Sequence, residues 1–518
     1  MKTLAKIACI AALALGLHTA PEARADVRMP VIFSDNMVLQ QGMLVPVWGW
    51  ADEGETVLVQ FQNQRVSAKA KDGKWMVKLK NLKASAEPET MTISGKNRLV
   101  LQNILIGEVW VCSGQSNMEW PLNRSFEAAQ DIQKSVIPNL RLFAVQKARS
   151  DEPLSDLKQP WNSGKFAWQE SSPQSSYDFS AVGFYFGRAL QEARGVPVGM
   201  IHTSWGGTPA EAWTSRAALE ANQSLASILE SGDANREKYL AAKAAYDKAA
   251  AEAKKKGEKA KGAEPRAPWY PGELYNAMLA PLIPYAIKGA IWYQGESNAD
   301  RAYQYRTLFP EMIKNWRKDW GQGDFPFIAV QLAPWDRNQK RSLEEITKEP
   351  VESKWAELRE AQLLATRPPT KAGMVVITDV GDKDDIHPTK KQPVGERLAL
   401  AARTLAYNEK IVSSGPLYKN MRVKGNQAIL NFDSVGGGLE AKDGELKGFA
   451  ICGEDKKFVW GKAEIVGNTV VVTADSVAKP VAVRYGWADF PVVNLFNKEG
   501  LPATPFRTDD FPLTTAPK

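Results

Sequence analysis

Histidine and cysteine are scarce in this chain, and their scarcity narrows its chemistry. The 518 residues include three histidines and three cysteines. No histidine, cysteine and carboxylate residues cluster at the spacing of metal ligands, so we expect no metal centre and no cofactor. The cysteines are too few for a disulfide framework. Cys112 lies within an apolar run and is expected to be an inert thiol in the core.

Apolar runs long enough to cross a membrane are also missing. The run IACIAALALGL at residues 7–17 is shorter than the roughly 20 residues that span a bilayer. Lysines precede this run and ARA follows it, which is the layout of a secretory signal peptide over residues 1–25. We therefore expect a mature chain that starts at Asp26, has no membrane anchor and works in the secreted or periplasmic space.

The chain has little excess of either charge. Its formal net charge is +7, spread along the sequence. The densest basic stretch, AKKKGEKAKG at residues 253–262, lies in an Ala/Lys/Glu-rich segment over residues 230–266. That composition is typical of a solvated helical insertion, either a helix pair or a mobile segment. We therefore expect no nucleic-acid partner.

Three regions with different sequence patterns follow one another along the mature chain. Residues 26–105 carry short β-rich runs divided by turns, which predict a small antiparallel β domain. Residues 106–410 alternate apolar runs of strand length with helical segments, which predict an α/β domain built on a parallel sheet. Short strands return over residues 411–518, and they predict a second β domain.

Four strand-like runs of the α/β region end in polar or glycine-rich sequence. These ends are SGQSN at 113–117, SWGGTP at 204–209, QGESN at 294–298 and DVGDKDDIHP at 379–388. Open parallel sheets form their sites at the carboxyl ends of strands. The four ends therefore predict one shared site.

Within that predicted site, histidine gives the sharpest inference. His202 lies inside a strand run and is expected to be a core residue, whereas His387 follows Asp384 and Asp385 in a polar loop. A serine hydroxyl is a poor nucleophile until a base removes its proton, and a carboxylate best orients that base. Ser116 at the end of one strand and His387 at the end of another therefore predict acyl-transfer chemistry.

The surroundings of Ser116 exclude one hydrolase class and resemble another. The stretch GQSNM does not fit the G-x-S-x-G elbow of α/β-hydrolases. Six stretches are distinctive: GEVWVCSGQSNMEWPL, TSWGGTPAEAW, LYNAMLAPLIPYAIKGAIWYQGESNADRAYQYRTLFPEMIKNWR, FPFIAVQLAPW, DIHPTKKQPVGERLALAA and RYGWADFPVVNLFNKEGLPATPFRTD. Through them, nearly the whole mature chain, apart from residues 230–266, resembles the sialate O-acetylesterase family of the SGNH hydrolase superfamily.

The resemblance implies a fold and a reaction. The fold is a three-layer, flavodoxin-like SGNH catalytic domain with a parallel sheet, flanked by β-sandwich-like modules. The reaction removes acetyl groups from carbohydrate hydroxyls without a cofactor. Ser116 would be the nucleophile and His387 the general base. The D-x-x-H pattern of the superfamily favours Asp384 as the acid, with Asp385 as the alternative.

The same resemblance suggests donors for the oxyanion. They are the Ser116 N–H and the glycine block, which falls on Gly206 and Gly207. The asparagine block departs from the family pattern, because QGESN lacks G-x-N-D. Gln294 is the first choice for a side-chain amide donor and Asn298 the second.

Other polar residues at the strand ends have expected roles in support or recognition. Gln115 and Asn117 are expected to hold the turn or touch the substrate, and Glu296 to orient a neighbour. A sialate carries a carboxylate, which arginine often binds. Arg124 and Arg301 follow strand ends and are the candidates, although each is also consistent with a solvated surface residue.

The family resemblance favours 9-O-acetyl sialic acid as the substrate, ahead of acetylated xylan. Both substrates would use the same catalytic residues. A carbohydrate-binding protein with an inactive esterase-like domain is a further alternative, since the 17 tryptophans suit sugar stacking. A glycosidase would need two catalytic carboxylates, and the sequence singles out no partner for Glu296.

Overall fold

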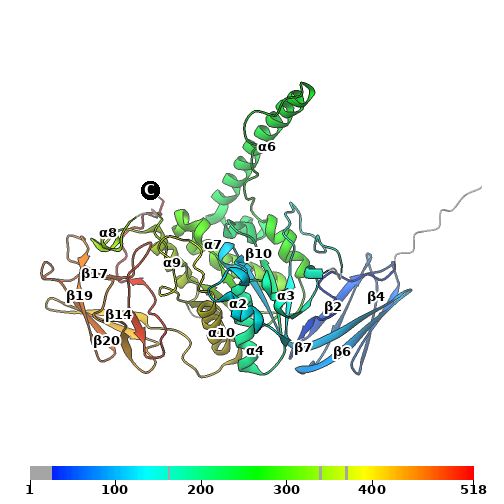
Figure 1. The fold of residues 1–518 in the computed structure, drawn as a ribbon, viewed down its shortest axis with the longest axis horizontal. Helices are drawn as coiled ribbons and strands as arrows, with labels where there is room; N and C mark the ends of the chain where they lie inside the picture. The colour runs from blue at the N-terminus through cyan, green and yellow to red at the C-terminus, as the bar shows by residue number, and fades with distance from the viewer. Residues whose placement is uncertain (1–25, 162–163, 338–340, 368–370, 518) are drawn as a thin grey trace, which may run out of the picture.

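The computed structural model describes residues 26–161, 164–337, 341–367 and 371–517. The predicted signal peptide over residues 1–25 lies outside the described residues. Figure 1 shows the N-terminal strands at one end of the molecule, the C-terminal strands at the other and the α/β region between them. Among the described residues, no helix is both long and apolar enough to cross a membrane.

A mostly parallel sheet forms the centre of the α/β region. Its strand order is β13-β12-β11-β7-β10-β8-β9, and all neighbours are parallel except β8 and β9. The strands are β13 (Ala372–Val375), β12 (Phe327–Val330), β11 (Gly289–Tyr293), β7 (Arg98–Gly114), β10 (Val198–Ser204), β8 (Ile137–Ala144) and β9 (Gln169–Ser171). The predicted α/β architecture with a central, mostly parallel sheet is confirmed.

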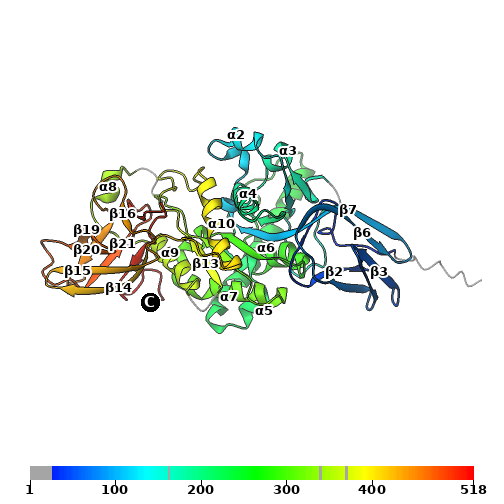
Figure 2. The ribbon, with the colours of Figure 1, turned by 90° about the horizontal axis from the view of Figure 1, so that it is seen from below.

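Helices cover both faces of this sheet because its strands are apolar on both sides. From β7, Trp110 and Cys112 pack into the core that includes α4 (Ala181–Arg194) and α10 (Gln392–Tyr407). Val109 and Val111 alternate with them and face the opposite core, under α7 (Ala302–Trp320) and α9 (Lys354–Ala365). Figure 2 shows α4 on one side of the sheet and α7 on the other. Cys112 is fully buried, as predicted, and burial raises the pKa of its thiol.

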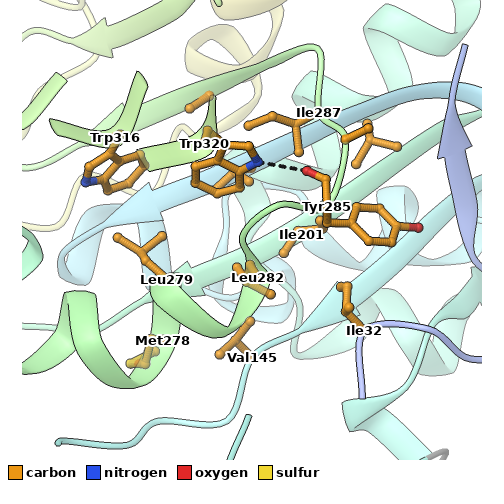
Figure 3. Packing of buried hydrophobic residues seen from close by; sticks show 14 of the residues in the cluster. Ile32, Val145, Ile201, Met278, Leu279, Leu282, Tyr285, Ile287, Trp316 and Trp320 are labelled. Carbon is orange, nitrogen blue, oxygen red and sulfur yellow. Dashed lines mark hydrogen bonds between the residues drawn. The ribbon is translucent and has the colours of Figure 1, made fainter. Parts of the chain in front are cut away.

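The second core is rich in large aromatic side chains (Figure 3). Trp316 and Trp320 of α7 (Ala302–Trp320) lie beside Leu282 and Tyr285 in this core. The Trp320 indole N–H donates to the Tyr285 carbonyl over 2.8 Å. This bond satisfies the polar edge of a ring that is otherwise surrounded by apolar atoms.

Strand β7 connects the N-terminal strands to the central sheet. Its first half pairs antiparallel with β6 and parallel with β1, and its second half lies between β10 and β11. The boundary predicted after residue 105 therefore falls inside one continuous strand. The N-terminal strands are β1 (Val38–Gln40), β2 (Val45–Trp50), β3 (Thr56–Phe61), β4 (Gln64–Lys69), β5 (Lys74–Leu79) and β6 (Ser85–Ser94).

The C-terminal strands form two antiparallel sheets around a separate core. The sheet orders are β14-β15-β20-β19 and β18-β17-β21-β23, with β16 paired to β22 beside them. The strands are β14 (Leu417–Lys424), β15 (Gln427–Asp433), β16 (Leu439–Ala441), β17 (Phe449–Cys452), β18 (Val459–Trp460), β19 (Lys462–Val466), β20 (Thr469–Thr473), β21 (Ala482–Tyr485), β22 (Leu495–Asn497) and β23 (Phe506–Arg507).

The Ala/Lys/Glu-rich segment forms a long arm. Helix α6 (Ala226–Lys255) has 30 residues, which corresponds to about 45 Å, and it projects away from the body of the molecule in Figure 1. The segment after it returns without regular structure, and Lys243 pairs with Glu264 over 3.3 Å. One helix with an extended return therefore stands where the sequence suggested a helix pair or a mobile segment.

The remaining α-helices are mostly short connections. They are α1 (Ser116–Glu119), α2 (Ala128–Gln133), α3 (Pro173–Tyr177), α5 (Arg216–Glu220), α8 (Leu343–Thr347) and α9 (Lys354–Ala365). Brief 3₁₀ turns include η1 (Leu122–Arg124) and η7 (Glu296–Arg301). Because α1 and η7 directly follow β7 and the loop after β11, they place polar side chains at the carboxyl edge of the sheet.

A buried arginine joins the C-terminal strands to the α/β region. Arg359 of α9 donates to the Leu332 and Ala333 carbonyls over 2.8 and 3.2 Å. It also donates to the Ala488 and Asp489 carbonyls over 2.6 and 2.8 Å. The guanidinium fork therefore satisfies carbonyl groups from both regions at once.

We expect Arg359→Met to destabilise the protein by roughly 3 kcal/mol, because it leaves buried carbonyls without donors. Part of this cost is offset, because the variant no longer has to bury a charged guanidinium. The measurement is the midpoint of urea unfolding followed by tryptophan fluorescence. Lys314→Met is the matched control, because the Lys314 side chain is 75% exposed. Equal midpoints for the two variants would show that Arg359 does not join the regions.

Candidate active site

The turn after β7 presents Ser116 at the edge of the central sheet. Gly114 has φ +139°, and a Cβ on this residue would lie 2.1 Å from the Tyr293 carbonyl oxygen, so only glycine fits. The next N–H, of Gln115, donates to that same carbonyl over 2.9 Å. Helix α1 then begins at Ser116, so the chain leaves the sheet at the predicted nucleophile.

His387 lies in contact with this serine. Its Nε2 is 2.8 Å from the Ser116 Oγ, and its ring stacks on Trp120 with centroids 5.3 Å apart. Burial is the main cause that lowers the pKa of His387, and the charge of Lys391 adds to the effect while Asp385 opposes it. The imidazole is therefore neutral at neutral pH and able to accept a proton.

The aspartate next to His387 is Asp385. Its Oδ1 lies 3.5 Å from His387 Nδ1 and accepts the His387 backbone N–H over 2.8 Å. Asp384 instead pairs with Lys383 and is exposed. The geometry therefore favours Asp385, the alternative, over Asp384, the first choice from the sequence. The loop turns this way because Asp382 Oδ1 accepts the N–H groups of residues 384 and 385, at 2.9 and 3.1 Å.

Of the two glycines after β10, only Gly206 is placed beside the nucleophile. A Cβ on Gly206 would lie 3.2 Å from the Ser116 Cβ, whereas one on Gly207 would meet open space. The Gly206 N–H donates to Glu119 Oε2 over 2.6 Å, and Glu119 also pairs with Lys147. The sequence analysis missed Glu119, although it lies three residues after Ser116, on the same face of a helical turn.

The two expected amide donors point away from Ser116 into the interior. The Gln294 Nε2 donates to Asn298 Oδ1 over 2.6 Å and to the Thr208 carbonyl over 3.2 Å. The Asn298 amide in turn donates to Glu211 over 2.9 Å. Both side chains are buried, and these bonds join the loops after β10 and β11. Neither residue lines the cavity over Ser116, so the structure does not favour the oxyanion roles expected for Gln294 and Asn298.

Gln115, Asn117 and Glu296 support the turn from beneath. The Gln115 Oε1 accepts the Gly295 N–H over 3.3 Å. The Asn117 amide donates to Glu296 Oε1 over 2.6 Å and to the Ile386 carbonyl over 3.0 Å. Of the two roles expected for Gln115 and Asn117, the structure therefore favours holding the turn. Glu296 orients Asn117, as expected for a carboxylate that positions a neighbour.

The two arginines considered for substrate binding lie in different surroundings. The Arg124 guanidinium lies 4.3 Å from the centroid of the Trp120 ring and lines the cavity described next. Arg301 donates to Glu211 over 2.5 Å and to Gln304 over 2.7 Å, outside the residues that line the cavity. Arg301 is therefore an ion-pair partner of a structural carboxylate, and only Arg124 remains a candidate for binding.

A cavity of about 1190 Å³ opens over Ser116 and His387. Its walls include the rings of Trp120, Trp205 and Phe179. His202 lies within β10, as expected, and its Nε2 is 2.5 Å from the Ser204 Oγ; it is partly buried and also lines the cavity. Burial lowers the pKa of His202 to about 4, which keeps its ring neutral. The cavity is large enough for a sugar ring and its neighbours.

The described residues contain no group of three or more histidine, cysteine or carboxylate side chains close enough to share a metal ion. The chemistry that the site itself offers is a serine hydroxyl in contact with a neutral imidazole, with backbone N–H groups beside them. Such an arrangement is suited to acyl transfer.

Comparison with known proteins agrees with this chemistry. A family model for carbohydrate esterases, described as sialic acid-specific acetylesterase, matches residues 106–404. The human sialate O-acetylesterase is 29% identical over 92% of each chain, and the mouse enzyme 30% identical over 86% of each. A carbohydrate acetylesterase from Xanthomonas citri has a similar structure, with a TM-score of 0.79, 35% identity, and coverage of 94% of this chain and 100% of that one.

The fold and the match together define an ester hydrolase that acts on carbohydrates. The chain belongs to the sialic acid-specific acetylesterase family of carbohydrate esterases. The resemblance found in the sequence is thereby confirmed, and so is the prediction of an esterase.

The two aspartates of the histidine loop allow a matched comparison. We expect Asp385→Asn to lower kcat on acetyl esters by about 10²-fold, because the amide keeps the backbone bond but cannot stabilise the imidazolium. A larger loss is not expected, because the Asp385 side chain is 56% exposed. Asp384→Asn should keep kcat within about twofold. A stronger effect at Asp384 than at Asp385 would contradict the geometry described above.

Proposed function

We propose that the protein is a serine esterase of the SGNH type, which removes O-acetyl groups from sugars through an acetyl-serine intermediate. The observation that carries this proposal is the 2.8 Å contact between Ser116 Oγ and His387 Nε2 at the floor of the cavity. We further propose that it acts in the secreted or periplasmic space, after removal of residues 1–25.

In the acylation step, Ser116 Oγ attacks the carbonyl carbon of the acetyl ester while His387 Nε2 takes the hydroxyl proton. The carbonyl electron pair moves onto oxygen, and Asp385 stabilises the imidazolium. When the tetrahedral intermediate collapses, the bond to the sugar oxygen breaks and His387 gives its proton to that oxygen. The products are the free sugar hydroxyl and acetyl-Ser116.

Water completes the cycle by the same route. His387 takes a proton from water as the water oxygen attacks the acetyl-serine carbonyl. Collapse of the second intermediate returns the proton to Ser116 Oγ and releases acetate. One base therefore serves both halves of the reaction.

Two backbone N–H groups, those of Ser116 and Gly206, are proposed as donors to the oxyanion. The Gly206 N–H holds an oxygen of the Glu119 carboxylate at 2.6 Å, beside Ser116. An anionic oxygen is thus accommodated where negative charge would develop. The acetyl oxygen must replace Glu119 at this N–H, and Lys147, the other partner of Glu119, is in place to keep the displaced carboxylate.

Ser116→Ala and His387→Ala should each lower acetyl-ester hydrolysis by several orders of magnitude. The double variant should be little worse than either single variant, because the two groups act as a unit. The measurement is release of 4-nitrophenol from its acetate ester, with far-UV circular dichroism to verify folding. A folded Ser116→Ala variant with near-full activity would exclude the serine mechanism.

For the substrate, we propose 9-O-acetyl sialic acid. Support comes from the cation at the cavity wall: Arg124 lies over Trp120, and no carboxylate of the described residues forms an ion pair with it. An unpaired guanidinium beside an aromatic ring suits a sugar that carries a carboxylate. The relatives named sialate O-acetylesterase favour the same substrate.

Acetylated xylan is the second candidate, and one observation favours it. The carboxylate of Glu119 shares the cavity with Ser116, and a negative charge there opposes an anionic sugar while accepting hydrogen bonds from neutral hydroxyls. The Xanthomonas citri relative is described only as a carbohydrate acetylesterase, which is compatible with either substrate.

The substrates are separated by kcat/KM on 9-O-acetyl-N-acetylneuraminic acid and on acetylated xylo-oligosaccharides. We expect the wild type to prefer the sialate, and Arg124→Met to reduce that preference at least about tenfold, because one charge-assisted contact is lost. Arg301→Met is the control and should leave the ratio unchanged. A preference for the xylan fragments of more than about 100-fold, or roughly 2.7 kcal/mol, would refute the sialate assignment but not the esterase chemistry.

A further inference from the structure

A buried lysine lies behind the catalytic pair and has no part in the mechanism described so far. Lys391, just before α10, is 1% exposed. Its Nζ donates to Asn117 Oδ1 over 2.6 Å and lies 5.7 and 5.4 Å from the ring centroids of Trp120 and Tyr293. Burial of an amine is costly unless its surroundings compensate for lost hydration. Its place therefore calls for a functional reason.

Asn117 makes this lysine part of a junction between three loops. Its amide nitrogen donates to Glu296 in the loop after β11 and to the carbonyl of Ile386 in the histidine loop, and its oxygen accepts from Lys391. Asn117 itself directly follows Ser116. Because Ile386 directly precedes His387, the junction fixes the imidazole relative to the serine hydroxyl.

The charges around His387 come from several elements. Lys391 and Arg124 of η1 disfavour a proton on the imidazole, and Asp385 favours one. Glu296 of η7 faces Lys391 and favours its charged form, as does Asp385. Burial, the largest cause, lowers the pKa of Lys391 to about 7, so the amine is charged on the acid side of neutrality, where His387 titrates.

We propose that Lys391 is a positioning residue for the esterase reaction: through Asn117 it holds the histidine loop against the nucleophile, and with its charge it keeps His387 in the proton-accepting form. Glu296 is the counter-charge that makes the burial of Lys391 tolerable. The proposal rests on the proposed function, because it assigns Lys391 a role only if His387 is the base for Ser116.

The test is the pH dependence of kcat/KM for acetate release, whose acid limb reports the essential base of the free enzyme. Lys391→Met removes a positive charge near His387, so protonation of the imidazole becomes easier and the acid limb moves to higher pH, by about one unit. Glu296→Gln keeps an oxygen acceptor for Asn117 but removes the carboxylate that favours the charged form of Lys391. Lys391 then loses its proton over the pH range in which His387 titrates, so the acid limb should move in the same direction, to higher pH.

Lys390→Met is the matched control, since Lys390 is the exposed neighbour of Lys391 and solvent screens its charge. Its acid limb should stay in place. Shifts to higher pH in both variants support the proposal, because a purely structural role would lower kcat without moving the limb, and a shift to lower pH in either variant would contradict it. If Lys391→Met does not fold, the pH profile of Glu296→Gln still tests the proposal. If Ser116→Ala is inactive and the acid limbs of the folded Lys391 and Glu296 variants do not shift, the proposal for Lys391 is wrong. If Ser116→Ala is active, the proposed function itself is wrong.

Discussion

The close approach between Gly114 and the Tyr293 carbonyl fixes the geometry of the whole site. No side chain fits between these two backbone segments at Gly114, where the paired strands β7 and β11 end and the chain turns. Ser116, the loop after β11 and the histidine loop take their places from that point. The contact between Ser116 and His387 therefore depends first on the backbone packing of two parallel strands and then on side-chain bonds.

Behind that turn, polar groups occupy space that an ordinary core would fill with apolar ones. The Asn117 amide bonds both the Glu296 carboxylate and the Lys391 amine, and Glu296 Oε2 is buried without a hydrogen-bond partner among the described residues. Each buried charge in such a network is costly unless it is compensated, so the loss of one member leaves the others in a less favourable place. The loops that carry Ser116 and His387 therefore depend on the same few polar contacts.

The sequence predicted those features that depend on strand periodicity and strand ends. Apolar runs identified the parallel sheet, and the rule that sites form at the carboxyl ends of strands brought Ser116 and His387 together. The sequence did not predict features that depend on the direction in which a side chain points. Gln294 and Asn298 stand at a strand end, yet their amides turn inward to bond each other. The choice between Asp384 and Asp385 depends on how Asp382 caps the loop backbone, and this cannot be predicted from the D-x-x-H spacing alone.

The continuity of β7 also has an evolutionary consequence. Its two halves belong to different sets of strands, so a recombination breakpoint between residues 105 and 106 would cut one strand in two and expose the core that both sets share. The N-terminal strands and the central sheet are therefore linked through the backbone of one shared strand. The C-terminal strands enclose their own core and meet the α/β region through side-chain contacts such as those of Arg359. A cut between modules therefore damages a strand at one end of this chain, whereas at the other end it removes side-chain contacts.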